Sequence, residues 1–478
     1  MRIGFFTDTH LGATLYRGAR GWRTKEADIS DIRRGDVYGS FNAALEVFLK
    51  ERPDIVVHLG DLLEGRASAT IFNDLTSVMN GIRTLLDAGI RVILLEGNHD
   101  FRRYADSKDQ PFTVIETALS DYLNRGSLVI VRAGEYRIVE GWARVPIVAV
   151  GYHDEGDNFR GLSGTLRRAA GELNGKRAVL LLHQTVGDVW GIPEFYRIED
   201  IPDNFVYTFN GHIHKRKLVV RPPRIFVNPG SVEYQDMGEA WDVLELLHLY
   251  DYLERTYGHD KALEMFKRVV MKGVVFLDLN APRIRNLIDP EDVDPEGDEF
   301  PTYYWNSSRP PVFYHPLPTS RPFLKAEVQQ QGVGNFRGAL DRLLTIFNGL
   351  GVKAPVLSVV ARMDEGSLSN LQAYLLGLLD AGKLSALRVL YESPVEFEQE
   401  EETDHEDKYA VFGKYAPVLR TVDGDIDEIL DRKAQKEEAK RGEKKKLDDE
   451  IEKLKERVKE KILSALKEES YTEGGEPC

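Results

Sequence analysis

The sequence predicts an α/β sandwich, in which β-sheets are covered by helices, followed by a smaller α+β unit and a helical tail. Over the first 240 residues, short apolar runs alternate with longer amphipathic stretches, the pattern of strands joined by helices. Short polar motifs follow directly on several apolar runs, as expected where strands end at one edge of a sheet. The 478 residues exceed one ordinary core, so we expect two or three packed units.

The first unit, residues 1–240, contains six candidate strands. Each is a short apolar run, and they lie at Ile3–Thr7, Ile55–Leu59, Val92–Leu95, Val145–Val150, Ala178–Leu182 and Phe205–Phe209. Helical patterns fall between some of them. In 41–49 and 72–86, apolar residues recur at three and four positions, which predicts helices that bury one face.

Beyond residue 240, the chain changes pattern. We interpret 241–272 as a helical insertion and 273–394 as a capping domain of α+β type. The capping domain begins with the strand-like run at Gly273, passes a proline-rich stretch, and contains a candidate helix at 336–350 and a candidate strand at 355–361.

The C-terminal part is strongly charged. Residues 395–410 contain an acidic run and are expected to form a solvated linker, and 411–478 are expected to form a helical tail. Apolar residues repeat at three and four positions in the tail, at Leu447, Ile451, Leu454, Val458 and Ile462. Two interpretations stay open: a helix packed on its own domain, or a docking helix for a partner.

Composition excludes several classes of protein. No run approaches the roughly 20 apolar residues of a membrane span, and the N-terminus lacks the layout of a secretory signal. We therefore expect a soluble, cytoplasmic protein without a membrane partner. The single cysteine, Cys478, is the last residue, so any metal within the fold must be held by Asp, Asn, Glu or His.

Net charge argues at first against a nucleic-acid partner. The chain carries 63 basic and 78 acidic residues, a net charge of −15. The excess is uneven, because residues 391–478 hold 27 acidic and 17 basic residues. The first 390 residues are consequently close to neutral, which weakens the objection.

Five polar motifs follow closely on candidate strands. They are Asp8-Thr-His10, Gly60-Asp61, Gly97-Asn98-His99-Asp100, His183 and Gly211-His212-Ile-His214. Carboxyl ends of strands meet at one edge of an open α/β sheet, so these side chains can converge. Asp, Asn and His together suit divalent ions, and one carboxylate between two ions can bridge them. We expect the glycines before Asp61, Asn98 and His212 to permit tight turns.

Each motif alone is weak evidence, since a lone histidine at a strand end is usually a structural residue. The joint order of five motifs, with five of the chain's 11 histidines, favours a two-metal site. His58 and His153 are interpreted as structural residues.

This order, D-x-H, G-D, G-N-H-D, H and G-H-x-H, resembles that of the calcineurin-like metallophosphoesterases over roughly residues 1–235. Within that superfamily, the runs 182–184, 211–216 and 228–233 look like those of DNA double-strand-break repair nucleases of the meiotic recombination eleven or SbcD type. Arg321-Pro322-Phe323 is similar to the start of that family's capping domain.

The resemblance implies a two-sheet metallophosphoesterase sandwich and a manganese-dependent exonuclease or endonuclease with two Mn²⁺ ions per chain. One ion would be held by Asp8, His10, Asp61 and His214, and the other by Asp61, Asn98, His183 and His212. His99 matches the residue that stabilises the transition state or protonates the leaving oxygen, and a supporting role stays open for it. The resemblance also implies a homodimer and an SMC-like coiled-coil ATPase bound through the C-terminal helices.

Two features depart from the family's pattern. A histidine that helps place the DNA strand commonly stands three residues after the bridging aspartate, where this chain has Glu64. A carboxylate there would repel phosphate, so the polarity of cutting and the DNA substrate are open. The segment Ala13–Tyr38 carries Arg17, Arg20, Arg23, Arg33 and Arg34 and is interpreted as a DNA-contacting loop or a solvated insertion.

A basic run follows the last motif. Residues 215–224 contain no acidic residue, and we expect Lys215, Arg216 and Lys217 to contact a phosphate backbone without reading base sequence. Two alternatives stay open. One is a small-molecule or cyclic-nucleotide phosphodiesterase on the same fold, which the acidic charge and Glu64 favour. The other is an inactive scaffold, which the complete ligand set argues against.

Overall fold

The computed structural model describes residues 1–13, 21–25, 29–64, 71–101, 110–154, 159–190, 195–221, 224–279 and 312–392. The chain divides into two units, Met1–Glu392 and Ser393–Cys478. The acidic linker and the helical tail predicted from the sequence both lie outside the described residues. In the part of the chain that is described, no helix combines the length and apolar character needed to cross a membrane.

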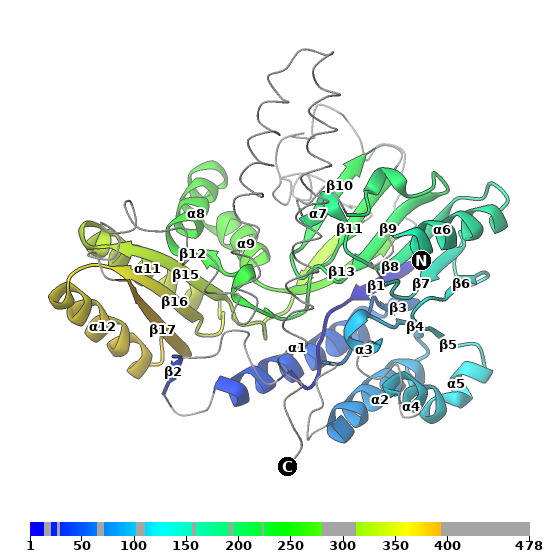
Figure 1. The fold of residues 1–478 in the computed structure, drawn as a ribbon, viewed down its shortest axis with the longest axis horizontal. Helices are drawn as coiled ribbons and strands as arrows, with labels where there is room; N and C mark the ends of the chain where they lie inside the picture. Colours follow the sequence, from blue (N-terminus) through cyan, green and yellow to red (C-terminus); the bar gives the residue numbers. More distant parts are fainter. Residues whose placement is uncertain are drawn as a thin grey trace, which may run out of the picture. The chain divides into compact units, whose positions relative to one another are not determined.

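Three β-sheets organise the first unit (Figure 1). The first sheet runs, in spatial order, through β14 (Val312–Pro316), β13 (Gly273–Asp278), β1 (Arg2–Phe6), β3 (Ile55–His58), β4 (Arg91–Leu95) and β5 (Leu128–Val131). The second runs through β10 (Lys217–Arg221), β11 (Arg224–Asn228), β9 (Phe205–Gly211), β8 (Ala178–His183), β7 (Ile147–Val150) and β6 (Tyr136–Val139). The third runs through β12 (Trp241–Asp242), β15 (Phe323–Gln329), β16 (Val356–Arg362), β17 (Ala386–Glu392) and β2 (Arg23–Thr24).

The first two sheets pack face to face. Ile3 and Phe5 of β1 share a buried core with Leu181 of β8 and Phe209 of β9. The rings of Phe5 and Phe209 stack with centroids 3.7 Å apart. Because side chains alternate along a strand, Phe6 points to the opposite face of the first sheet, where it joins the helical core. The predicted α/β sandwich is therefore confirmed.

Helices cover the outer faces of this sandwich. On the first sheet lie α1 (Ile29–Glu51), α2 (Ile71–Asp87) and α4 (Pro111–Ala118), and on the second lies α6 (Arg160–Glu172). Short helices α3 (Asn98–Phe101), α5 (Ser120–Asn124) and α7 (Gly187–Trp190) complete the connections. In α1, Val37, Phe41, Ala44 and Phe48 are buried, and this spacing of three and four residues forms the apolar stripe that holds the helix.

The third sheet has a core of its own with four helices. They are α8 (Val243–Tyr257), α9 (His259–Val270), α11 (Val333–Gly349) and α12 (Glu365–Asp380). Side chains of α8 and α9 lie in the same buried cluster as those of β15 and α11. Asp242 caps α8 by accepting hydrogen bonds from the backbone N–H groups of Leu244 and Glu245.

This arrangement differs from the division that the sequence suggested. Residues 241–272, expected as an insertion, pack with the third sheet, whereas β13 and β14 pair into the first sheet: β13 lies antiparallel to β1, with Ile3 opposite Leu277. A strand's apolar pattern shows that it is buried but not which partner it pairs with, so the return of the chain to the first sheet at residue 273 could not be found from pattern alone.

The segment Ala13–Tyr38 is likewise not one loop. Residues 29–38 belong to α1, and β2 pairs with β17 at the edge of the third sheet. Arg33 is fully buried and donates from Nη1 to the carbonyl of Tyr234 at 2.6 Å, so it holds the fold together and cannot contact DNA. Arg17 and Arg20 lie outside the described residues.

Candidate metal centre

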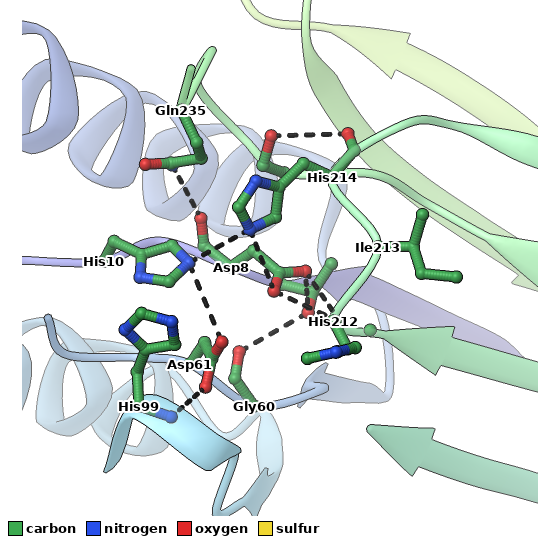
Figure 2. Close-up of polar contacts among 12 residues, drawn as sticks. Asp8, His10, Gly60, Asp61, His99, His212, Ile213, His214 and Gln235 are labelled. Atoms are coloured by element: carbon green, nitrogen blue, oxygen red, sulfur yellow. Dashed lines mark hydrogen bonds and ion pairs between the residues drawn. The ribbon is translucent and has the colours of Figure 1, made fainter. Parts of the chain in front are cut away.

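The residues predicted as metal ligands converge at one edge of the sandwich, where the loops after β1, β3, β4, β8 and β9 meet. Figure 2 shows Asp8, His10, Asp61, His212 and His214 pointing toward one another, with His99 beside them. Four overlapping groups each hold three ligand atoms within 4.8 Å of one another. They are Asp8, His10 and His214; His10, Asp61 and His99; Asp61, His183 and His212; and His214, Asp236 and Glu239. The structure thus brings together side chains more than 200 positions apart in the sequence.

The backbone at this edge is strained. Asp8, His10, Asp61 and His212 have φ angles of 52°, 45°, 54° and 76°, in the left-handed region that non-glycine residues rarely adopt. Backbone hydrogen bonds between the loop after β1 and the loop after β3 hold this conformation. They run from Asp8 N to Gly60 O and from His10 N to Asp61 O, and each is 3.1 Å long. Such strain persists where surrounding contacts enforce it, and it clusters at functional sites.

Two glycines allow the loops to approach one another. Gly60 has a φ of +107°, and a Cβ there would lie 2.3 Å from His183 Nδ1. A Cβ on Gly97 would lie 2.3 Å from both the backbone nitrogen and Oδ1 of Asp61. The positive φ of Gly60 fits the tight turn that we expected before Asp61. Gly97 has no positive φ, and a side chain is excluded there because its loop lies directly against Asp61.

The first group of ligands surrounds His10. Its Nε2 lies 3.3 Å from Nε2 of His214 and 3.7 Å from Oδ2 of Asp61. Nε2 of His214 in turn lies 3.9 Å from Oδ1 of Asp8. Oxygen and nitrogen atoms therefore face a common centre.

The second group surrounds Asn98. Its Oδ1 lies 3.1 Å from Nε2 of His183 and 2.7 Å from Nδ1 of His212. His183 Nε2 also lies 3.3 Å from Oδ1 of Asp61. Asp61 therefore contributes one oxygen toward each group, as a bridging carboxylate would.

Neighbouring groups orient these side chains. Nδ1 of His183 lies 2.7 Å from the carbonyl of Leu59, and Nδ1 of His214 lies 3.5 Å from Oε1 of the buried Glu239. Partners of this kind fix the ring and the tautomer of a metal-binding histidine. The Gln235 side chain donates to the backbone carbonyl of Asp8 at 3.0 Å.

Sequence reasoning missed these supporting residues. Gln235 and Glu239 follow the run 228–233 that was singled out, but neither has a motif of its own. His58 is confirmed as structural, since its Nε2 lies 3.1 Å from Thr9 Oγ1 and its Nδ1 accepts the backbone N–H of Gly60.

His99 and Asp100 take different places. The backbone N–H of His99 donates to Asp61 Oδ1 at 2.8 Å, while its side chain is 22% exposed and lies with Nδ1 3.4 Å from Oε1 of Glu64. Asp100 is buried and accepts hydrogen bonds from the backbone N–H groups of Leu62, Leu63 and Gly97. Asp100 therefore ties two of the site's loops together.

Burial and neighbouring charges lower the pKa of two of the site's histidines and raise the pKa of two others. Burial lowers the pKa of His10 and His212, which favours the neutral imidazole that binds metals. Burial also acts to lower the pKa of His99, but the contact with Glu64 and the charge of Asp61 outweigh it and raise the pKa. Burial would likewise lower the pKa of His183, yet Asp61 raises it to about 9.

The donor set fits divalent metal ions. Asp8 and Asp61 are 0% and 1% exposed, and the imidazoles of His10, His183, His212 and His214 offer ligand atoms beside them. A cation would neutralise the buried carboxylates, and mixed oxygen and imidazole ligation suits ions such as Mn²⁺ or Zn²⁺. The ligand atoms of each group already lie within 4.8 Å of one another, which is close enough for one ion to contact all of them.

The three basic residues predicted to bind DNA differ in their surroundings. Lys215 is exposed. Arg216 is half-buried, donates to the carbonyl of Arg268 at 2.6 Å and lies 3.8 Å from the ring centroid of Tyr314, whereas Lys217 donates to the carbonyl of Asp188 at 3.2 Å. The guanidinium of Arg216 is engaged within the fold, so of the three only Lys215 presents its charge fully to solvent.

Comparison with known proteins identifies relatives. The calcineurin-like phosphoesterase family matches residues 1–216. The DNA double-strand break repair protein Mre11 of Methanococcus maripaludis is 26% identical over 260 residues, which cover 54% of this chain and 62% of the relative. The protein of the same name from Methanocaldococcus jannaschii is 29% identical over 291 residues, covering 59% of this chain and 69% of the relative.

A third Mre11, from Sulfurisphaera tokodaii, is 28% identical over 45% of this chain and 50% of its own length. The chain thus spans between half and about two thirds of these relatives. Among solved structures, a dimetal phosphatase from Danio rerio is similar at 12% identity and a TM-score of 0.32, over 48% of this chain and 88% of the phosphatase.

Proposed function

Because residues 1–216 match the calcineurin-like phosphoesterase family, we propose that this chain is a metal-dependent nuclease that hydrolyses DNA phosphodiester bonds in double-strand break repair. The observation that carries the proposal is the position of Asp61 between the two ligand groups: its Oδ2 lies 3.7 Å from Nε2 of His10, and its Oδ1 lies 3.3 Å from Nε2 of His183. The repair proteins similar to this chain support DNA as the substrate.

We assign the ligands by these two groups. Asp8, His10, Asp61 and His214 would hold one ion, and Asp61, Asn98, His183 and His212 the other, with Mn²⁺ as the proposed metal. Two divalent ions supply polarisation of the phosphodiester and a bound water of lowered pKa. The strained loops hold the ligand atoms in place before metal and substrate arrive, which is how a site gains from preorganisation.

His99 is proposed as the group that protonates the leaving oxygen or stabilises the transition state. Its side chain is partly exposed beside the ligands, and its raised pKa favours the protonated form that can donate. Lys215 is proposed to contact the DNA backbone. Arg216 and Lys217 would assist mainly by fixing the loop that carries it.

The proposal extends to assembly. We propose that the protein works as a homodimer and binds an SMC-like coiled-coil ATPase through residues 411–478. The proposed dimer contact is formed by α1 and α2, the helices that follow the first two motifs. Phe72 at the start of α2 is 80% exposed, and an exposed aromatic side chain supports a contact with the second subunit there.

The test is digestion of end-labelled double-stranded and single-stranded DNA with Mn²⁺, alongside bis-p-nitrophenyl phosphate. Asp61→Ala removes the shared carboxylate and should reduce cleavage at least about 10³-fold with loss of bound metal. His99→Gln should keep the metal, measured by elemental analysis, and lose roughly 10²–10⁴-fold in turnover.

The outcomes separate the candidate functions. Cleavage of DNA by wild type and not by Asp61→Ala supports the nuclease, and the product ladder gives the polarity of cutting. Hydrolysis of the small diester alone would move the substrate to a small-molecule or cyclic-nucleotide diester, an alternative that the carboxylate of Glu64 beside His99 favours. Loss of metal from His99→Gln would contradict the role proposed for His99.

A further inference from the structure

Glu64 lies between two histidines of the site. Its Oε2 is 3.2 Å from Nδ1 of His10, and its Oε1 is 3.4 Å from Nδ1 of His99. The side chain is 15% exposed, and the two imidazole rings stand perpendicular with centroids 4.7 Å apart. One carboxylate thus faces the same ring nitrogen of both histidines.

The backbone places Glu64 firmly. Its N–H donates to the carbonyl of Leu11 at 2.8 Å, and Leu63 forms a parallel bridge with Leu11. The loop that carries Glu64 is therefore attached to the loop that carries His10. A displacement of one loop would move both the carboxylate and the imidazole.

The two nitrogens of His10 face different surroundings. Nε2 points to the ligand atoms of His214 and Asp61. Nδ1 is buried without a hydrogen bond of good geometry in the described part of the chain, and Glu64 provides the carboxylate within ion-pair distance. Asp100, the neighbouring buried acid, cannot replace Glu64, because its oxygens already accept three backbone N–H groups.

We propose that Glu64 is a positioning residue that sets the orientation and tautomer of His10 and His99 together. Attraction to the proton on Nδ1 leaves Nε2 of His10 unprotonated and directed at the metal centre. The same contact fixes the ring of His99, which bears the proton-donating role. The inference rests on the proposed function and adds a residue that couples metal binding to turnover.

The test uses three single variants of the full chain. Glu64→Gln keeps the size of the side chain but removes the charge and one of the two acceptor oxygens, and Glu64→Asp keeps the charge on a shorter side chain. Glu365→Gln, at an exposed position at the start of α12, removes the same charge away from the site and from the proposed dimer contact, and it is the matched control.

Mn²⁺ binding to metal-free protein is measured by isothermal titration calorimetry, and kcat and KM are measured with bis-p-nitrophenyl phosphate at saturating Mn²⁺. We expect Glu64→Gln to weaken Mn²⁺ binding about 10- to 100-fold and to lower kcat with little change in KM. Glu64→Asp should recover part of both losses, and Glu365→Gln should match wild type.

Wild-type Mn²⁺ affinity and kcat in Glu64→Gln would overturn the proposal. Equal losses in Glu64→Asp and Glu64→Gln, with a lowered thermal midpoint in both, would also overturn it, since the residue would then serve only stability. Failure of the proposed function would give a different result, because wild type would bind Mn²⁺ but cleave neither DNA nor the diester. In that case the comparison of Mn²⁺ affinities between wild type and the Glu64 variants would still test the role of Glu64.

Discussion

At the scale of single residues, buried polar side chains connect the candidate metal centre to the rest of the fold. Arg33 donates to the side-chain oxygen of Gln235, and the amide of Gln235 donates to the carbonyl of Asp8. The left-handed backbone at Asp8 is therefore supported by a helix residue outside the ligand set. Loss of one member of such a chain leaves a buried partner unsatisfied, which costs more than the bond itself contributes.

Glu233 gives the molecule a pH-dependent stability. Burial and the charge of Asp36 raise its pKa to about 7, well above the value near 4.3 of an unfolded chain. Between these values the folded state binds more protons than the unfolded state, so stability falls as pH rises through this window.

We compare the free energy of unfolding of Glu233→Gln with that of wild type at two pH values. We expect the variant to gain roughly 1–3 kcal/mol relative to wild type between pH 4.5 and pH 8, because it lacks the group that destabilises wild type as pH rises. The free energy of unfolding is measured by urea denaturation at both pH values. The hydrogen bond from Ser40 to Glu233 can still form with the amide oxygen. Parallel pH dependence of the two proteins would show that Glu233 titrates normally.

The convergence of the proposed ligand residues could be predicted from the sequence, whereas the residues that support them could not. Asp8, Asp61 and His183 stand at strand ends in a fixed order, so their types and places both carry information. Glu239 and Gln235 act through contacts that depend on how distant loops pack, and their local sequence shows nothing unusual. Glu64 was singled out as a departure, but its contact with both His10 and His99 needed three dimensions.

At the scale of elements, α1 joins the sandwich to the third sheet. Its apolar stripe packs on the first sheet, while Asp36, 3% exposed, pairs with Arg321 at 2.6 Å and Lys353 at 2.9 Å. Arg321 precedes β15 and Lys353 precedes β16. One carboxylate on α1 thus holds the entries of two strands of the third sheet.

Asp36→Asn should destabilise the protein by about 2–4 kcal/mol, because it leaves two partly buried cations without their counter-ion. Asp31→Asn on the same helix, 65% exposed, should change stability by less than about 0.5 kcal/mol. Urea denaturation of both variants measures the difference. Equal small effects would mean that water and other groups compensate the two cations.

Long apolar strands were predictable at this scale, and short or edge elements were not. β1, β3, β4, β8 and β9 match the predicted strands to within two residues at each end. β2 and β12 have two residues each, too few for any alternation to show, and they exist because a neighbouring strand pairs with them. The pairing of β13 with β1 joins residues far apart in the sequence, so pattern alone could not reveal it.

At the scale of the whole molecule, activity and partner binding are expected to separate along the chain. The ligand residues all lie within Met1–Glu392, one of the two units of the chain. Most of the excess negative charge falls beyond it, because residues 393–478 hold 26 acidic and 17 basic residues.

Deleting residues 420–478 should leave Mn²⁺-dependent cleavage within about twofold of wild type, because no proposed ligand is removed, and should abolish binding of an SMC-like ATPase. Pull-down with the ATPase and digestion of labelled DNA are run on the same preparations. An unchanged pull-down would refute the docking role of the tail.

The place of β13 constrains how the protein can be made. β1 is synthesised well before β13, yet one of its two edges is covered only when β13, more than 250 residues later, has been made. Until then the nascent chain carries an exposed strand edge, which can pair with another polypeptide. Co-translational folding of the sandwich therefore cannot finish before translation has passed β13 and the helices α8 and α9. A stalled or prematurely terminated message would yield a product that exposes this edge to aggregation.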